Sequence, residues 1–255
     1  MSYLSHDPKT CSVCNPVSPQ EAALKAKKAE GRAAMEKVKA QQAITDAQQT
    51  KEFSLLLATV YGEALNSATL IYQDKTYTSG KIRPFVNPRN KKVWYDYPEE
   101  LVEKIYRFGR IKYEKSSISA WKAVASVIMN RVNNYPGSPQ TVTEVITQPN
   151  QFSAYDLKNQ SFCEVMAYLE NPEENKEPKD LNNMLQYIKP VYYSKTTKTD
   201  ATAYFSPLAQ QYMYAKGSYR MSASDIMIQR DKEGYEEVEG IGLLPTDDFI
   251  FYKRR

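Results

Sequence analysis

A glutamate at the edge of an apolar helical stripe is the residue in this sequence best suited to do chemistry. Glu63 follows Leu56 by seven residues and Val60 by three, within the stretch LLLATVYGEALNS. On an α-helix these spacings place the three side chains on one face. A carboxyl group at the edge of a core is partly desolvated, which raises its pKa and favours the protonated form that a general acid needs. The same spacing also fits an ordinary glutamate near a helix end that pairs with a cation or faces water.

The supply of histidine and cysteine limits the other kinds of site. The single histidine, His6, lies in the N-terminal tail, so we expect neither a Ser-His-Asp nor a Cys-His hydrolase, and no catalytic zinc held by histidines. The three cysteines, Cys11, Cys14 and Cys163, do not build a disulfide framework. Cys11, Cys14 and His6 are candidate ligands of a structural zinc in the tail, but a fourth ligand is not evident, so no cofactor is expected. Carboxylates are the acid–base groups that remain.

Composition indicates a folded chain without a nucleic-acid partner. Of the 255 residues, 42% are hydrophobic and 25% are charged, which suits one substantial core with appendages. The net charge of +4 arises from 34 basic and 30 acidic residues, and it is too small and too mixed to indicate nucleic acid. No apolar run is long enough to span a membrane, and the N-terminus lacks the pattern of a secretory signal. We therefore expect synthesis in the cytoplasm.

The chain divides by composition into three segments. Residues 1–17 are irregular and contain the C-x-x-C pair. Residues 18–50 are rich in Ala, Lys, Glu and Gln, and the SPQE sequence that begins at Ser18 is a capping box. This segment has few large apolar side chains, so we expect a solvated helical arm that links or docks. Residues 51–255 are expected to form the globular domain, with a Tyr- and Lys-rich insertion at about 66–116.

Within the globular domain, helical patterns predominate over strands. The segment ISAWKAVASVIMNRVNN is apolar on several sides, which is typical of a central, buried helix. Aromatic and β-branched residues toward the C-terminus predict strands. The predicted helices are residues 98–111, 118–134, a short helix at the start of TVTEVITQPNQFSAYD, and 181–188. The predicted strands are residues 190–207 and 248–255, and the insertion is expected to begin as a hairpin or loop excursion. The fold class that follows is α+β, mostly helical with a small β-sheet, preceded by a long N-terminal helix.

Four short motifs occur in a fixed order: ATVYGEA, AVASVIMNRV, VITQPNQFS and ATAYFSP. With these motifs the sequence resembles the SleB-type cell-wall hydrolases, the spore cortex-lytic enzyme family, over about residues 55–63, 121–156 and patches from 201 onward. The resemblance implies a lysozyme-like fold and cleavage of the bond between N-acetylmuramic acid and N-acetylglucosamine in peptidoglycan, typically as a lytic transglycosylase. It also implies that Glu63 is the catalytic acid and that glycan strands are the binding partner.

The resemblance also points to residues that contact the substrate. In QPNQFSAYD, polar side chains can bind sugar hydroxyl and N-acetyl groups, and aromatic rings can lie beneath a sugar. The candidate substrate-binding residues are Gln151, Phe152, Ser153, Tyr155, Tyr204 and, from the NRV motif, Asn130. From the residues alone, the favoured interpretation is instead that Phe152 is a core side chain and that Gln151 caps a turn.

A single carboxylate suffices for the implied transglycosylase mechanism, because Glu63 acts first as an acid and then as a base. Hydrolysis by water would instead require a second carboxylate, for which Asp74, Asp96 and Asp156 are candidates. The insertion at 66–116 departs from the family. It is either a lid or substrate-length selector, or a decorated surface loop.

The tail and the arm predict a route by which such an enzyme is delivered. We expect a phage lysin (endolysin) or an injected effector, a bacteriolytic enzyme that reaches the cell wall or periplasm through a holin, a phage particle or a secretion machine. Its N-terminal arm would dock on a carrier or phage-structural protein. The main alternative is a non-catalytic structural or glycan-binding component of a phage tail or baseplate. A zinc-ribbon nucleic-acid binder is the third, and no basic patch in the sequence supports it.

Overall fold

The computed structural model describes residues 18–87, 89–132, 134, 137–149, 151–155 and 158–255. Backbone contacts divide the chain into a first unit, residues 1–50, and a second unit, residues 51–255. The two units are described separately below.

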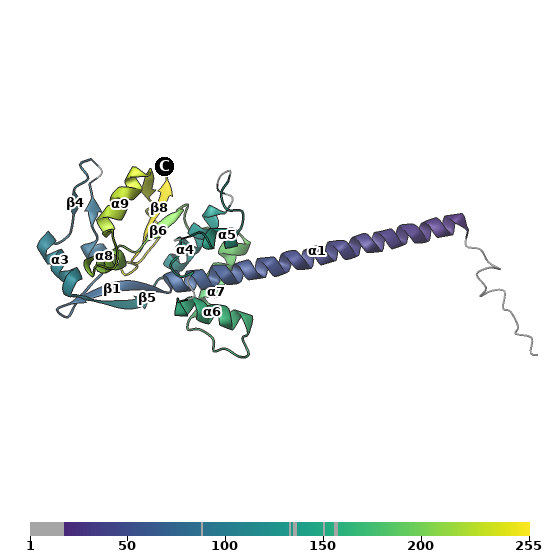
Figure 1. The fold of residues 1–255 in the computed structure, drawn as a ribbon, viewed down its shortest axis with the longest axis horizontal. Coiled ribbons are helices and arrows are strands. Elements are labelled where there is room, and N and C mark those ends of the chain that lie inside the picture. The colour runs from purple at the N-terminus through teal and green to yellow at the C-terminus, as the bar shows by residue number, and fades with distance from the viewer. Residues whose placement is uncertain (1–17, 88, 133, 135–136, 150, 156–157) are drawn as a thin grey trace, which may run out of the picture. The chain divides into compact units, whose positions relative to one another are not determined.

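The described part of the first unit is helical throughout. Helix α1, Pro19–Ala64, begins in this unit and ends in the second (Figure 1). The hydroxyl of Ser18 accepts the backbone N–H of Glu21 at 3.2 Å, as the capping box predicts. The few large apolar side chains of the arm are exposed: Leu24, Met35, Val38 and Ile44. The predicted long N-terminal helix is therefore confirmed, and this part of it makes no core of its own.

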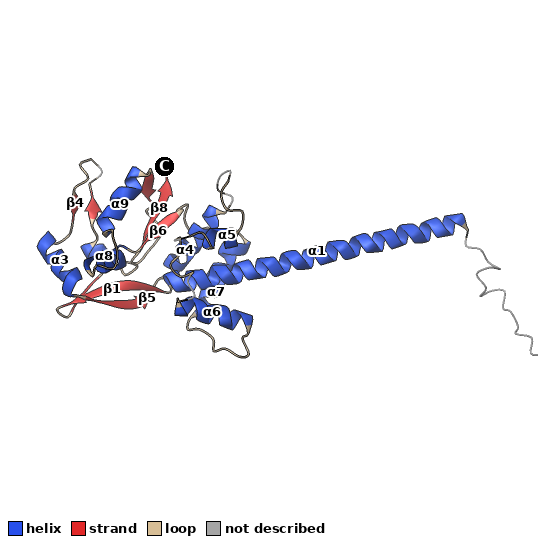
Figure 2. Ribbon diagram, in the orientation of Figure 1, coloured by secondary structure: helices blue, strands red, loops and turns tan. Residues whose placement is uncertain are grey.

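The second unit combines helices with small antiparallel sheets (Figure 2). After α1, its described helices are α2 (Ser79–Ile82), α3 (Glu99–Phe108), α4 (Ile118–Arg131), α5 (Val142–Ile146), α6 (Gln160–Glu170), α7 (Leu181–Tyr193), α8 (Pro207–Ala215) and α9 (Ala223–Lys232). Its described strands are β1 (Asn66–Tyr72), β2 (Lys75–Tyr77), β3 (Phe85–Val86), β4 (Val93–Trp94), β5 (Arg110–Lys115), β6 (Ala203–Phe205), β7 (Tyr235–Glu237) and β8 (Ile250–Arg254). They pair in the orders β2-β1-β5, β3-β4 and β6-β8-β7. The predicted α+β class is confirmed.

The main core forms where the last turns of α1 meet α4. Leu56 and Val60 of α1, and Trp121 and Ile128 of α4, are all fully buried. Helix α4 also packs along α7. Since α4 is covered on several sides, it is the central helix that its apolar pattern predicts. The core thus fixes the end of α1, which carries Glu63.

The insertion packs together with α8 around a second core, which is separate from the main core. Strand β1 pairs with both β2 and β5, and α3 packs against β1 and α8. Ile82, Ile105 and Tyr106 are fully buried together with Leu208, which belongs to α8. The insertion is therefore a packed layer of the second unit, because a decorated surface loop would not contribute to a shared core.

Two predictions about secondary structure toward the C-terminus have different outcomes. The strand predicted at 248–255 is confirmed by β8. The strand predicted at 190–207 is wrong over its first part, because α7 continues to Tyr193 and only Ala203–Phe205 is a strand. Val191 extends the buried stripe of α7 and is fully buried, so core packing outweighs its β-propensity. Helices α6, α8 and α9 and strand β7 had no predicted counterpart.

A buried aspartate ties the start of α8 to the segment that precedes β8. Asp248 is 1% exposed. Its carboxylate accepts the hydroxyl of Ser206 and the backbone N–H groups of Leu208 at 3.0 Å and Ala209 at 3.2 Å. Burial raises the pKa of Asp248 to about 6, and the three donors only partly oppose this rise.

The raised pKa of Asp248 predicts a loss of stability as the pH rises. An acid whose pKa is higher in the folded state stabilises the fold fully below its unfolded value, 3.8, and loses that contribution as the pH passes about 6. We expect a loss of roughly 2–3 kcal/mol in the free energy of unfolding between about pH 4 and 7. Asp248→Asn should remove this part of the pH dependence. Urea unfolding of both proteins across that range measures it, and parallel curves would contradict the assignment.

Candidate active site

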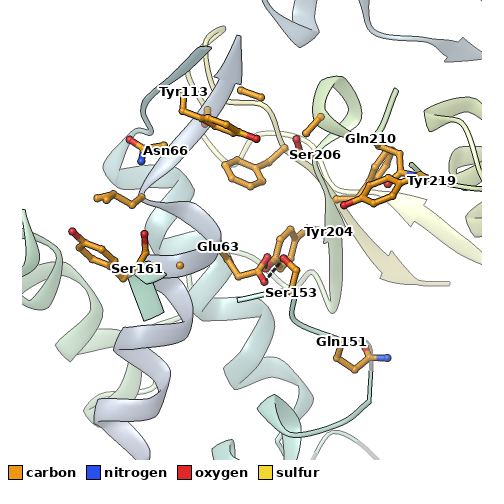
Figure 3. A pocket seen from close by; sticks show the side chains of 18 residues that line it. Glu63, Asn66, Tyr113, Gln151, Ser153, Ser161, Tyr204, Ser206, Gln210 and Tyr219 are labelled. Carbon is orange, nitrogen blue, oxygen red and sulfur yellow. Dashed lines mark hydrogen bonds between the residues drawn. The ribbon is translucent and has the colours of Figure 1, made fainter. Parts of the chain in front are cut away.

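The end of α1 opens into a pocket of about 500 Å³. Its described lining comes from α1, from β1 and β5 of the insertion, from the start of α6 and the segment before it, from β6 to just past α8, and from the residue before β8. Figure 3 shows Glu63, Ser153 and Tyr204 pointing toward one another, with Tyr113 and Tyr219 apart from this cluster. Elements far apart in the sequence therefore meet around one carboxyl group.

Three hydrogen bonds hold the carboxylate of Glu63, which is half-buried. Its Oε1 accepts the Ser153 hydroxyl at 2.9 Å and the backbone N–H of Ala154 at 2.6 Å. Its Oε2 accepts the hydroxyl of Tyr204 at 2.9 Å. All three donors are neutral. The carboxylate is thus fixed in one orientation by partners that do not themselves carry charge.

A close approach between α1 and the loop 151–155 makes these bonds geometrically achievable. Gly62 faces Ala154, and a Cβ built on Gly62 would lie only 2.7 Å from the Cβ of Ala154. Beside it, the side chain of Asn159 accepts the backbone N–H of Phe162 and caps α6. The missing side chain at Gly62 therefore lets the loop lie against the helix and bring the Ala154 N–H to Glu63.

Arg131, at the end of α4, anchors the same loop from the other side. Its Nε donates to the backbone oxygen of Thr202 at 2.6 Å, and its Nη1 donates to Oε1 of Gln151 at 2.8 Å. The guanidinium carbon lies 5.3 Å from the ring centre of Phe152. Arg131 therefore braces the loop.

The structure brings four of the predicted site residues together and leaves three outside the pocket lining. Glu63, Gln151, Ser153 and Tyr204 line the pocket. Phe152 is 5% exposed in the main core, Tyr155 packs edge-on against Phe162, and the Asn130 amide donates to the backbone oxygens of Thr199 and Ala201. In the structure, Phe152 is a core residue, Tyr155 packs against another ring, and Asn130 binds backbone oxygens. Contact of these three residues with a substrate stays a prediction.

Several lining residues were missed from the sequence, among them two exposed tyrosines. Tyr113 in β5 and Tyr219 after α8 are 66% and 46% exposed. The other missed polar residues are Asn66, Ser67, Ser161, Ser206 and Gln210. The 20 tyrosines gave no signal to choose among them, because only the pairing of β1 with β5 and the position of α8 bring these side chains to the pocket.

Glu63 is the one carboxylate in the described lining of the pocket. Asp74 and Asp96 are exposed elsewhere, and Asp156 lies outside the described residues. The tail residues Cys11, Cys14 and His6 also lie outside them, so the zinc candidates stay a prediction. Within the described residues, no group of three or more metal-ligating side chains is close enough to hold a metal ion. No described helix has the length and apolar character needed to cross a membrane.

Tyr204 stays a hydrogen-bond donor at any pH of interest. Burial, and next the charge of Glu63, raise the pKa of its phenol well above 10. We expect Tyr204→Phe to lower kcat about tenfold, because Glu63 loses the partner that orients Oε2, with KM and the melting temperature little changed. Steady-state kinetics on soluble glycan strands measures this split. A fall in kcat that is accompanied by a clear fall in the melting temperature would instead indicate that the Tyr204 hydroxyl mainly supports packing.

A comparison with protein families supports an enzyme that acts on peptidoglycan. Residues 115–225 match the family model described as Cell Wall Hydrolase. The matched part includes α4, Gln151, Ser153 and Tyr204, whereas Glu63 and the insertion precede it. The comparisons with curated proteins and with solved structures give no match. The predicted resemblance to SleB-type hydrolases is thus confirmed, and the lysozyme-like arrangement stays a prediction.

Proposed function

We propose that this protein cleaves the bond between N-acetylmuramic acid and N-acetylglucosamine as a lytic transglycosylase. The match of residues 115–225 to the Cell Wall Hydrolase family model supports peptidoglycan as the substrate. The observation that carries the proposal is the fixed carboxyl group of Glu63, held in a pocket by Ser153, Ala154 and Tyr204. The acid–base chemistry of the described lining is concentrated in this residue, which supports a mechanism in which one carboxyl group serves both steps.

In the first step, the proton for the leaving group resides on Oε2 of Glu63. Oε1 has two lone pairs, and it uses both to accept the Ser153 hydroxyl and the backbone N–H of Ala154, of which the N–H can only donate. Oε2 faces the hydroxyl of Tyr204, which can rotate and accept instead. Glu63 then gives its proton to the glycosidic oxygen as the bond from that oxygen to C1 of the muramic acid breaks.

In the second step, the ionised carboxylate acts as the base. It takes the proton of the muramic 6-hydroxyl while that oxygen bonds to C1, so an anhydro sugar forms and Glu63 recovers its proton. The three neutral donors stabilise the carboxylate between the steps without forming an ion pair that would hold it charged.

The tyrosines at the rim suit the sugars on either side of the cleaved bond. Tyr113 and Tyr219 offer exposed ring faces on which pyranose C–H groups can pack. Gln151 and Asn66 add amide groups for hydroxyl and N-acetyl oxygens. Since Tyr113 and Asn66 belong to the insertion, we propose that the insertion takes part in substrate binding.

Mass spectrometry of digested, purified sacculi tests the proposal. Fragments ending in anhydro-muramic acid are expected. Fragments with reducing ends would show that water cleaves the bond. The transglycosylase step would then be wrong, although the protein would still be a glycosidase. No cleavage by the folded protein would favour the glycan-binding or structural alternative.

We further propose that the N-terminal arm serves delivery, as in a phage lysin or an injected effector, and is not needed for the chemistry. Every described residue that lines the pocket belongs to the second unit. Deleting residues 1–50 should therefore leave the rate on purified sacculi within about twofold of the full chain. Turbidity assays on purified sacculi measure this rate, and a loss greater than about tenfold in a folded deletion variant would contradict the separation of roles.

A further inference from the structure

A second, basic pocket adjoins the candidate active site. It has a volume of about 320 Å³, near the lower end of the range for small-ligand sites. Arg131, Arg230 and Arg254 line it, and its described lining includes no acidic residue. The other lining residues used below are Gln151 and Tyr235.

The three arginines reach the pocket from different elements. Arg131 forms part of the wall, where it donates to the backbone oxygen of Thr202 and to Oε1 of Gln151. Arg230, in α9, lies over the ring of Tyr235 at 5.1 Å and pairs with Glu233 at 3.3 Å, which offsets one charge. Arg254 lies at the exposed end of β8.

The basic residues on either side of Arg254 in the sequence form ion pairs with aspartates. Lys253 pairs with Asp200 at 2.9 Å, and Arg255 pairs with Asp231 at 2.7 Å. Both pairs lie outside the described lining of the basic pocket. Among the described residues, no acidic side chain lies within ion-pair distance of Arg254, so its charge is available to an anion. A guanidinium group binds a carboxylate through two parallel hydrogen bonds.

Gln151 joins the basic pocket to the catalytic one. It lines both pockets, and its Oε1 accepts Arg131. Figure 3 shows Gln151 set apart from the cluster of Glu63, Ser153 and Tyr204, at the edge of the catalytic pocket. An anion in the basic pocket therefore belongs to a group attached close to the sugar that reacts at Glu63.

We propose that the basic pocket binds a carboxylate of the stem peptide carried by the muramic acid at the cleaved bond. This inference rests on the proposed function. The stem peptide hangs from that sugar through a lactyl ether, so it starts within reach of a pocket beside Glu63, and its amino acids bear free carboxylates. The protein would then prefer glycan strands with stem peptides over strands from which an amidase has removed them.

The experiment compares kcat/KM on two soluble substrates: glycan strands with stem peptides, and the same strands after amidase treatment. For the wild-type protein we expect the ratio of the two values to be about ten, falling as salt is raised. Arg254→Gln should lower this ratio about threefold, and the Arg230→Gln/Arg254→Gln double variant should bring it close to one. Arg110→Gln is the matched control, since it removes an exposed arginine of β5 that lines neither pocket and should leave the ratio unchanged.

A binding measurement separates this inference from the proposed function. Isothermal titration calorimetry of Glu63→Gln with the two kinds of soluble strand reports the preference without cleavage. Equal binding and equal kcat/KM on both substrates, or a ratio that the double variant does not change, would overturn the basic pocket alone. Failure to cleave either substrate while the preference in binding persists would overturn the catalytic proposal and support the pocket.

Discussion

Glu63→Gln should lower the rate of sacculus cleavage by about 10³-fold or more, because glutamine cannot donate the proton that the leaving oxygen requires. Glutamine has nearly the same shape, and its amide oxygen can still accept Ser153 and the Ala154 N–H while its amide N–H faces Tyr204. The fold and the binding of sacculi should therefore be retained. Release of soluble fragments from purified sacculi, followed with time, measures the change.

Glu52→Gln provides a matched control for that variant. Glu52 lies on the same helix and accepts the hydroxyl of a tyrosine, Tyr192, at 3.4 Å, yet it does not line the pocket. Its replacement should leave the rate within about twofold of wild type. A folded Glu63→Gln variant that releases fragments at the wild-type rate would refute the catalytic role of Glu63. Loss of sacculus binding together with cleavage would show instead that Glu63 mainly shapes the pocket.

Gly62→Ala should lower kcat by about ten- to a hundredfold although it adds a single methyl group. The new Cβ would lie 2.7 Å from the Cβ of Ala154, which is too close for two carbon atoms, so the loop must move. The N–H of Ala154 then moves away from Oε1 of Glu63, which it now meets at 2.6 Å. Because Gly62 is helical, alanine suits its backbone and the effect arises from the contact. Steady-state kinetics and thermal unfolding together measure it.

Two further variants test whether the contact between Gly62 and Ala154 causes the loss of activity. Gly31→Ala, in the same helix, has nothing within 4 Å of its new Cβ and should leave kcat unchanged. The Gly62→Ala/Ala154→Gly double variant removes the clashing methyl and should restore at least part of the lost activity. Wild-type kcat in Gly62→Ala would contradict the close-approach mechanism. So would a double variant no better than the single one, since the second substitution would then relieve nothing.

The sequence by itself determined the features that depend on local patterns. The stripe of Leu56, Val60 and Glu63 placed the carboxyl group at the edge of the core, and the capping box marked the start of α1. The apolar surface of the 118–134 segment identified the central helix, observed as Ile118–Arg131. These signals survive because helix periodicity and capping are set within a few residues of the chain.

Only the tertiary structure decided what surrounds Glu63. Tyr204 and Ser153 meet it from 141 and 90 residues away in the chain, and Tyr113 reaches the pocket through the pairing of β1 with β5. The burial of Phe152 and the core shared by the insertion and α8 likewise depend on contacts between distant segments. Such contacts depend on which distant segments pack against one another. A local sequence pattern does not contain that information. The position of Glu63 at the edge of the core could therefore be predicted, whereas the walls of its pocket and the basic site beside it could not.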